Sequence, residues 1–182
     1  MLEKEYKRII TFLNKQKINY LVIGGIAVSV IGEPRETVDI DFCVFIKKGD
    51  IEAFFEKAQR DGYIVDKKEM LSRAKLTGSF NIRDGKVQID FLISSHELEK
   101  SSLNRKIEVE MHGVKAYYPT PEDLILFKIV PGRFQDLADI ESIAKRYSGK
   151  LDEKYLLNWA KKLSDEAEDM RIYKGVKRLL TL

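Results

Sequence analysis

The segment RETVDIDFCVFI, residues 35–46, decides the fold class of this chain. From residue 38 to residue 46 the residues alternate, with Asp39, Asp41 and Cys43 on one side of the pattern and mainly apolar residues on the other. A period of two is typical of a β-strand with two dissimilar faces. The pattern therefore predicts a strand over 38–46 whose two aspartates point to the same side of a sheet.

A glycine pair precedes this strand. Residues 20–23 form a short apolar run, Gly24-Gly25 ends it, and residues 26–31 continue for less than two helical turns. This order predicts a strand, a glycine turn and a short helix. Glycines that open a helix can bind phosphate through free backbone N–H groups and the helix dipole. A tight turn without any ligand would give the same pattern, so both interpretations stay open.

A third carboxylate follows in a predicted hairpin. Residues 80–83 and 86–92 flank Asp84-Gly85, a dipeptide that suits a two-residue turn. Asp90 lies in the second arm of this hairpin. Carboxylate oxygens are the ligands that Mg²⁺ prefers, and pairs of metal ions are commonly held by such groups. The spacing therefore predicts that Asp90 joins the two aspartates of the first strand in a metal site.

The other patterns are mainly helical. Thr120-Pro121-Glu122-Asp123 is typical of a helix start, with a threonine cap and proline in the first turn. We predict a second hairpin over 106–118 and helices over 2–17, 50–61, 120–130, 134–147, 153–163 and 166–180, and we leave 63–75 unassigned. The expected fold is α/β (α+β): a mixed sheet flanked by helices within a core of residues 1–118, with a helical region of residues 119–182 packed on it.

Composition limits the class of protein. Hydrophobic residues make up 44% of the 182 residues and charged residues 34%, which excludes a disordered, collagenous or membrane-embedded chain. The net charge of +3 names no partner by itself. Cys43 is the single cysteine, so no disulfide can form within the chain, and we interpret it as a small core residue. The charged N-terminal segment resembles neither a secretory signal nor a membrane anchor, so we expect a cytoplasmic protein.

The combined motifs resemble the nucleotidyltransferase superfamily, which includes DNA polymerase beta and the aminoglycoside nucleotidyltransferases. The resemblance rests on Gly24-Gly25, on Arg35-x-Thr37-x-Asp39-Ile40-Asp41 and on the helix that begins Thr-Pro-Glu-Asp, and it covers residues 18–147. The chain is most similar to the small prokaryotic branch near the abortive-infection and toxin–antitoxin nucleotidyltransferases. Many members have Gly-Ser where this chain has Gly-Gly, so backbone amides would replace the serine hydroxyl.

The resemblance also implies roles for individual residues. Asp39 and Asp41 would bind two Mg²⁺ or Mn²⁺ ions, and Asp90 would bind the catalytic ion and help to activate the acceptor hydroxyl. Gly24 and Gly25 would hold the triphosphate of an NTP.

Two basic residues are candidates for phosphate contacts. Lys128 would contact phosphate by resemblance, while Arg35 either contacts phosphate or pairs with an acidic residue of a strand. The nearby acids Asp136 and Asp139 share one helical face, which we interpret as salt-bridged or solvated rather than metal-binding.

The implied activity is the transfer of a nucleoside monophosphate from NTP to an acceptor hydroxyl, with release of pyrophosphate. The acceptor stays open between an RNA end, a protein side chain and a small molecule, because fold does not determine substrate. The alternative is a non-catalytic protein that binds a nucleotide or a partner, such as an antitoxin-like or regulatory subunit. We also expect a possible toxin–antitoxin partner protein, and we expect no membrane partner.

Overall fold

A four-stranded mixed sheet organises the first of the two compact units into which the chain divides. The computed structural model describes residues 2–181. The first unit comprises the chain up to Ile26 together with Glu36–Tyr118. Its elements are α1 (Glu3–Lys15), β1 (Tyr20–Ile23), the start of α2 (Gly24–Ile31), β2 (Ile40–Val44), α3 (Ile51–Arg60), α4 (Lys67–Thr77), β3 (Ser79–Asp84), β4 (Val87–Ile93), α5 (Glu97–Arg105), β5 (Ile107–Met111) and β6 (Val114–Tyr118).

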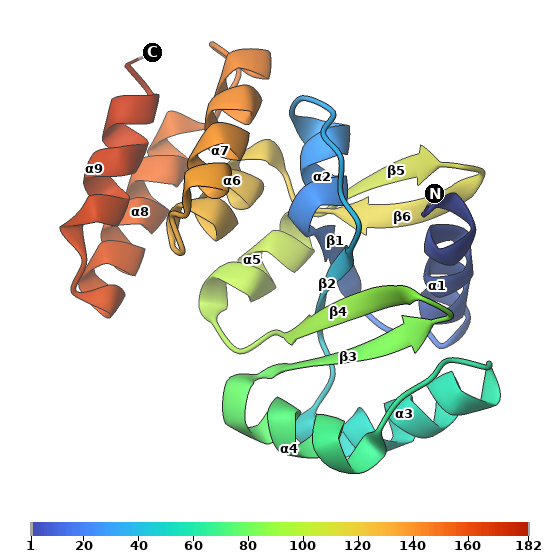
Figure 1. The fold of residues 1–182 in the computed structure, drawn as a ribbon. Coiled ribbons are helices and arrows are strands. Elements are labelled where there is room, and N and C mark those ends of the chain that lie inside the picture. Colours follow the sequence, from blue (N-terminus) through green and yellow to red (C-terminus); the bar gives the residue numbers. More distant parts are fainter. Residues whose placement is uncertain (1, 182) are drawn as a thin grey trace. The chain divides into compact units, whose positions relative to one another are not determined.

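The strand order of the sheet is β1-β2-β4-β3 (Figure 1). β1 runs antiparallel to β2, β2 runs parallel to β4, and β3 and β4 form the antiparallel hairpin predicted at Asp84-Gly85. Gly85 takes a φ of +59°, the left-handed conformation that this turn requires. The predicted mixed sheet is thus confirmed, and β5 and β6 form the second predicted hairpin.

One face of the sheet is an aromatic core. Phe91 of β4 stacks on Phe42 of β2 and on Phe80 of β3, with ring centroids 5.4 and 4.9 Å apart. Phe54 and Phe55 of α3 meet these rings, mostly edge to face, so α3 covers this side of the sheet (Figure 1). Because strand side chains alternate, the residues next to Phe42 and Phe91 point to the opposite face.

A buried tyrosine pair joins the first helix of this unit to its last strand. The hydroxyls of Tyr6 in α1 and Tyr118 in β6 share a hydrogen bond of 2.7 Å, and both residues are fully buried. Burial raises the pKa of Tyr118 to about 12, so the phenol stays protonated at neutral pH and can take part in that bond.

The second unit is helical and discontinuous in sequence. It comprises Ala27–Arg35 and the chain from Pro119 onward, with α6 (Pro121–Ile129), α7 (Phe134–Arg146), α8 (Glu153–Ala167) and α9 (Met170–Leu179). The predicted cap of α6 is confirmed, because the side chain of Thr120 accepts a hydrogen bond from the backbone of Asp123 at 3.3 Å. No helix within residues 2–181 is both long and apolar enough to cross a membrane.

Several predicted boundaries were wrong. α4 lies in the segment left unassigned, and α5 was not predicted at all. The buried side chains of α4 are Met70 and Ala74 alone, so its apolar stripe is too thin to reveal a helical period. α8 continues to Ala167, and α9 begins only at Met170, after the Asp169 cap. β2 is also shorter than the predicted strand over 38–46, because it begins at Ile40 and ends at Val44.

Candidate active site on the acidic strands

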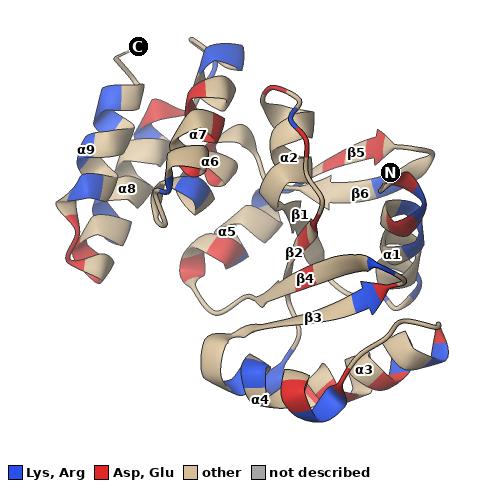
Figure 2. Ribbon diagram, viewed as in Figure 1, with Lys and Arg blue, Asp and Glu red and all other residues tan. Residues whose placement is uncertain are grey.

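Two carboxylates lie side by side at the centre of the sheet. The parallel register of β2 and β4 makes Asp41 and Asp90 direct partners. Both residues are half-buried and lie on the face opposite the Phe42–Phe91 stack. Figure 2 shows the adjacent acidic positions on the two strands. Like charges on directly opposite strand positions repel each other, so this arrangement favours binding of a cation.

Gly24 shapes the space beside Asp41. It follows β1, whose last residue Ile23 pairs with Asp41, and it takes a φ of +65°. A Cβ atom at Gly24 would lie 1.9 Å from the Oδ2 atom of Asp41 and 2.6 Å from its Cγ atom. Glycine is therefore required here for two reasons, the left-handed backbone and the contact with the carboxylate. The predicted glycine turn and the predicted acidic strand meet at this point.

Gln88 fixes the orientation of Asp90. Its side-chain amide donates hydrogen bonds to both carboxylate oxygens of Asp90, at 3.1 and 2.8 Å. The two residues are separated by one position in β4, so they share the exposed face of that strand. No role for Gln88 was predicted from the sequence, although its i, i+2 spacing from Asp90 on a strand indicated that the two side chains share a face.

Asp39 lies outside the strand that carries Asp41. It is exposed, and it precedes the first residue of β2. Among the described residues, the structure gathers no group of three or more His, Cys, Asp or Glu side chains that could hold a metal ion. The sheet thus brings Asp41 and Asp90 together, while Asp39 occupies the chain segment that leads into them.

The residues at the sheet nevertheless suit a divalent cation with a bound phosphate group. Asp41 and Asp90 supply the hard oxygen ligands that Mg²⁺ prefers. The absence of a side chain at Gly24 lets the carboxylate of Asp41 pack against the backbone at the start of α2. The amide of Gln88 holds Asp90 in place, as the outer partners of metal ligands commonly do.

The predicted phosphate contacts Arg35 and Lys128 belong to the helical unit. Arg35 donates to both carboxylate oxygens of Asp139, at 2.9 and 3.2 Å, so its acidic partner lies in helix α7 rather than in a strand. The ammonium of Lys128 is buried between Asp139, at 2.7 Å, and Asp136, at 3.1 Å. The interpretation of the two aspartates as salt-bridged is confirmed, and the phosphate contacts stay predictions.

The ion pairs in α7 shift the acidity of both aspartates. Burial raises the pKa of Asp136, but hydrogen bonds from Arg133 and Lys128 outweigh it, so the pKa lies below its usual value. The pKa of Asp139 is lowered in the same way, since the donors Lys128, Gln135 and Arg35 outweigh burial. Both carboxylates are therefore ionised at neutral pH and hold the two basic side chains in place.

Cys43 follows Asp41 on the same face of β2, but it is fully buried. Burial raises the pKa of its thiol, so it stays neutral. These properties fit its interpretation as a core residue.

Known structures with a similar fold are nucleotidyltransferases. The lincosamide antibiotic adenylyltransferase LnuA with bound lincomycin superposes with a TM-score of 0.55 and 16% identity, over 77% of this chain and 94% of that one. An antigenic nucleotidyltransferase-like protein from Paracoccidioides brasiliensis gives a TM-score of 0.53 and 15% identity, over 97% of this chain and 92% of that one. At such low identity these likenesses establish the fold alone.

The family of the chain follows from its sequence as a whole. No curated protein sequence matches it. Residues 1–177 match the family described as nucleotidyltransferase of unknown function (DUF6036). This match includes the glycine turn, both acidic strands and the helices that follow them. The chain belongs to this family of nucleotidyltransferases.

Proposed function

We propose that the protein transfers a nucleoside monophosphate from NTP to an acceptor hydroxyl in a reaction that requires Mg²⁺ or Mn²⁺. The observation that carries this proposal is the pairing of Asp41 with Asp90, with the carboxylate of Asp41 packed against Gly24 at the start of α2. The new bond joins the acceptor oxygen to the α-phosphorus, the bond from that phosphorus to the β-phosphate oxygen breaks, and pyrophosphate leaves with the electron pair.

The protein residues have separate tasks in this proposal. Asp41 and Asp90 hold the cations, with Asp39 as the third carboxylate, while Asp90 also accepts the proton of the attacking hydroxyl. When bound, two divalent cations neutralise the triphosphate and align the reacting oxygens. The backbone of Gly24 and Gly25 at the start of α2 binds phosphate oxygens, as helix N-termini commonly do.

Arg35 and Lys128 are proposed as further phosphate contacts. In the structure both cations are bonded to carboxylates of α7. A phosphate would therefore have to share these cations with Asp136 and Asp139. Their contribution to nucleotide binding is expected to be smaller than that of the glycine turn.

The test is incubation with each α-labelled NTP, Mg²⁺ or Mn²⁺, total cell RNA and total cell protein, followed by separation of the labelled pools. We expect label in one pool with the wild type and a loss of at least about hundredfold with Asp41→Asn or Asp90→Asn. Glu110→Gln, an exposed acid of β5, is the matched control and should keep full activity. Full activity in both aspartate variants would refute the site.

Calorimetry separates the enzyme from the alternative, a non-catalytic nucleotide- or partner-binding protein with a toxin–antitoxin or regulatory role. The proposed enzyme binds NTP only with Mg²⁺, and Asp41→Asn weakens that binding. Nucleotide binding without label in any pool would favour the binding role, and no binding at all would favour a protein partner.

A further inference from the structure

A second site candidate lies where β2 and β4 end. A cavity of about 790 Å³ opens at the carboxyl ends of these two parallel strands, next to the last turn of α4. Its walls include four lysines, Lys47, Lys48, Lys75 and Lys100. Phe45 follows Asp41 by four positions, which is about 13 Å along a strand. The cavity is therefore separate from the paired carboxylates of the candidate active site.

The charge of this cavity is not balanced by acidic residues. No Asp or Glu is among the described residues that line it. The four lysines are exposed, and within residues 2–181 none of them forms an ion pair. Four ammonium groups around one hollow repel one another unless an anion lies among them. Figure 2 shows the basic residues at the end of α4 and on the chain after β2.

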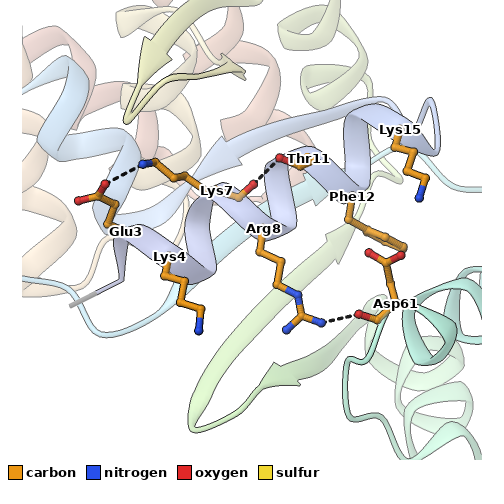
Figure 3. Close-up of a pocket in the computed structure, with 8 residues that line it drawn as sticks. All are labelled: Glu3, Lys4, Lys7, Arg8, Thr11, Phe12, Lys15 and Asp61. Atoms are coloured by element: carbon orange, nitrogen blue, oxygen red, sulfur yellow. Dashed lines mark hydrogen bonds and ion pairs between the residues drawn. The ribbon is translucent and has the colours of Figure 1, made fainter.

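A second basic cavity, on α1, is partly neutralised by acidic residues in its own lining. It measures about 740 Å³ and is lined by Lys4, Lys7, Arg8 and Lys15, but also by the acids Glu3 and Asp61. Figure 3 shows the ion pair of 2.8 Å between Lys7 and Glu3 and the hydrogen bond from Arg8 to the carbonyl of Asp61. Two of its four cations are thus occupied by partners within the protein.

Neutral hydrogen-bonding groups complete the lysine cavity. Thr77, Ser94 and Ser95 line it, together with apolar side chains that include Phe45 and Ile93. The hydroxyl of Ser94 is buried and has no hydrogen-bond partner among the described residues. An unsatisfied buried hydroxyl costs free energy, and rotation about its χ1 torsion would let it donate to a ligand oxygen. The lining therefore offers cations and the unsatisfied hydroxyl of Ser94 but no acidic group.

We propose that this cavity binds a chain of phosphates, either the backbone of single-stranded nucleic acid or free polyphosphate. Lysine binds phosphate as a flexible point charge, and four unpaired lysines exceed what a single phosphate group needs. The proposal goes beyond the transfer reaction and does not depend on it, because it concerns the other end of the same strands.

Binding of a fluorescent 20-nucleotide oligoadenylate, without NTP or metal, tests whether the ligand is single-stranded nucleic acid. For each phosphate contact, the association constant for a single strand falls by about 0.7 logarithmic units per tenfold increase in salt concentration. The double variant Lys47→Gln/Lys100→Gln should therefore lower this slope by about 1.4, which is roughly a 25-fold weaker binding at 0.1 M salt. The control Lys4→Gln/Lys15→Gln removes the same charge from α1 and should change neither value.

Binding of tripolyphosphate to the same variants, measured by calorimetry, tests whether the ligand is free polyphosphate. Binding of either ligand that depends on Lys47 and Lys100, but not on Lys4 and Lys15, supports the proposal and identifies the source. Equal effects of the two double variants, no effect of Lys47→Gln/Lys100→Gln, or no binding of either ligand would overturn it. Because no turnover is measured, a failed transfer assay leaves this result unaffected.

Discussion

At the scale of single residues, the candidate site depends on what lies against the two central carboxylates. Gly24 touches Asp41, and Gln88 holds Asp90. Neither contact adds a reactive group. Each one restricts where a carboxylate can point, and a restricted ligand binds a cation without losing further side-chain freedom. Substitutions of these neighbours are therefore informative tests of the site.

Gly24→Ala should damage both stability and activity. The new Cβ atom would lie 1.9 Å from the carboxylate of Asp41, at a backbone φ of +65°. A left-handed alanine alone costs about 1–2 kcal/mol, and the displaced carboxylate adds to this cost. Urea denaturation should show the loss in the free energy of unfolding. Gly49→Ala is the control, because a Cβ at Gly49 meets no atom within 4 Å, and it should be neutral.

Gln88→Leu should reduce activity but leave the fold intact. Gln88 is exposed, so the leucine needs no repacking, but Asp90 loses both amide hydrogen bonds. Losing the outer partner of a metal ligand typically lowers metal affinity or activity by about 10–100-fold. Nucleotide transfer measured over a Mg²⁺ titration should show the midpoint at a higher concentration. Gln59→Leu, an exposed glutamine of α3, should leave the midpoint unchanged, and an equal shift in both would argue against the role of Gln88.

At the scale of elements, the helices and strands that could be predicted are those with strong local sequence patterns. The period-two pattern around Asp41 and the Asp84-Gly85 turn gave β2, β3 and β4, because alternation and a positive-φ turn are local properties. The helix at Thr120 was equally readable from its cap. α4 and α5 were not predicted, because few of their side chains are buried and the apolar period is weak.

The candidate site was predictable in part for the same reason. Strand parity placed Asp41 on the same side as Asp39, and the hairpin pattern placed Asp90 in a strand, but only the sheet order makes Asp41 and Asp90 direct partners. The start of β2 at Ile40, which leaves Asp39 outside, depends on where pairing with β4 begins. The carboxylate partners of Lys128 and Arg35 lie in α7. That of Arg35 is 104 residues away, so no short spacing reveals the contact.

The packing of α3 on the sheet predicts a large effect for Phe54→Ala. This ring contacts Phe12, Phe80 and Phe91 and is almost completely buried. Its removal leaves a cavity under the strands that carry the carboxylates, and such substitutions cost about 3–5 kcal/mol. Thermal unfolding should show a drop of many degrees. Phe134→Ala is the control, because this side chain is 95% exposed, and its melting temperature should not change.

At the scale of the whole molecule, the ion pairs of the helical unit make its stability depend on pH. The pKa values of Asp136 and Asp139 lie below the usual 3.8 in the folded protein. A lowered pKa contributes stability that is present above the unfolded value and is lost as the pH falls through the folded value. We therefore expect a stable plateau down to about pH 4 and a steep loss below it.

Asp139→Asn tests this source of acid sensitivity. The variant removes a carboxylate from both Lys128 and Arg35, and breaking a buried pair costs about 3–5 kcal/mol. Its melting temperature should be lower at neutral pH and should fall less between pH 5 and pH 3 than that of the wild type. Asp165→Asn, at an exposed position of α8, should follow the wild-type curve. A wild-type curve for Asp139→Asn would contradict this account.

Residues 27–35 belong to the helical unit, and this sets the order in which the two units can fold during synthesis. Arg35 pairs with Asp139, and the carbonyl of Gly32 accepts a hydrogen bond from Arg146, 114 residues later. At about 5–20 residues per second, a ribosome needs roughly 5–20 s to make the 104 residues that separate the first pair. The sheet unit is complete in sequence at Tyr118, before α6 exists. The helical unit thus forms last, and a polypeptide that begins at Pro119 would lack its first piece.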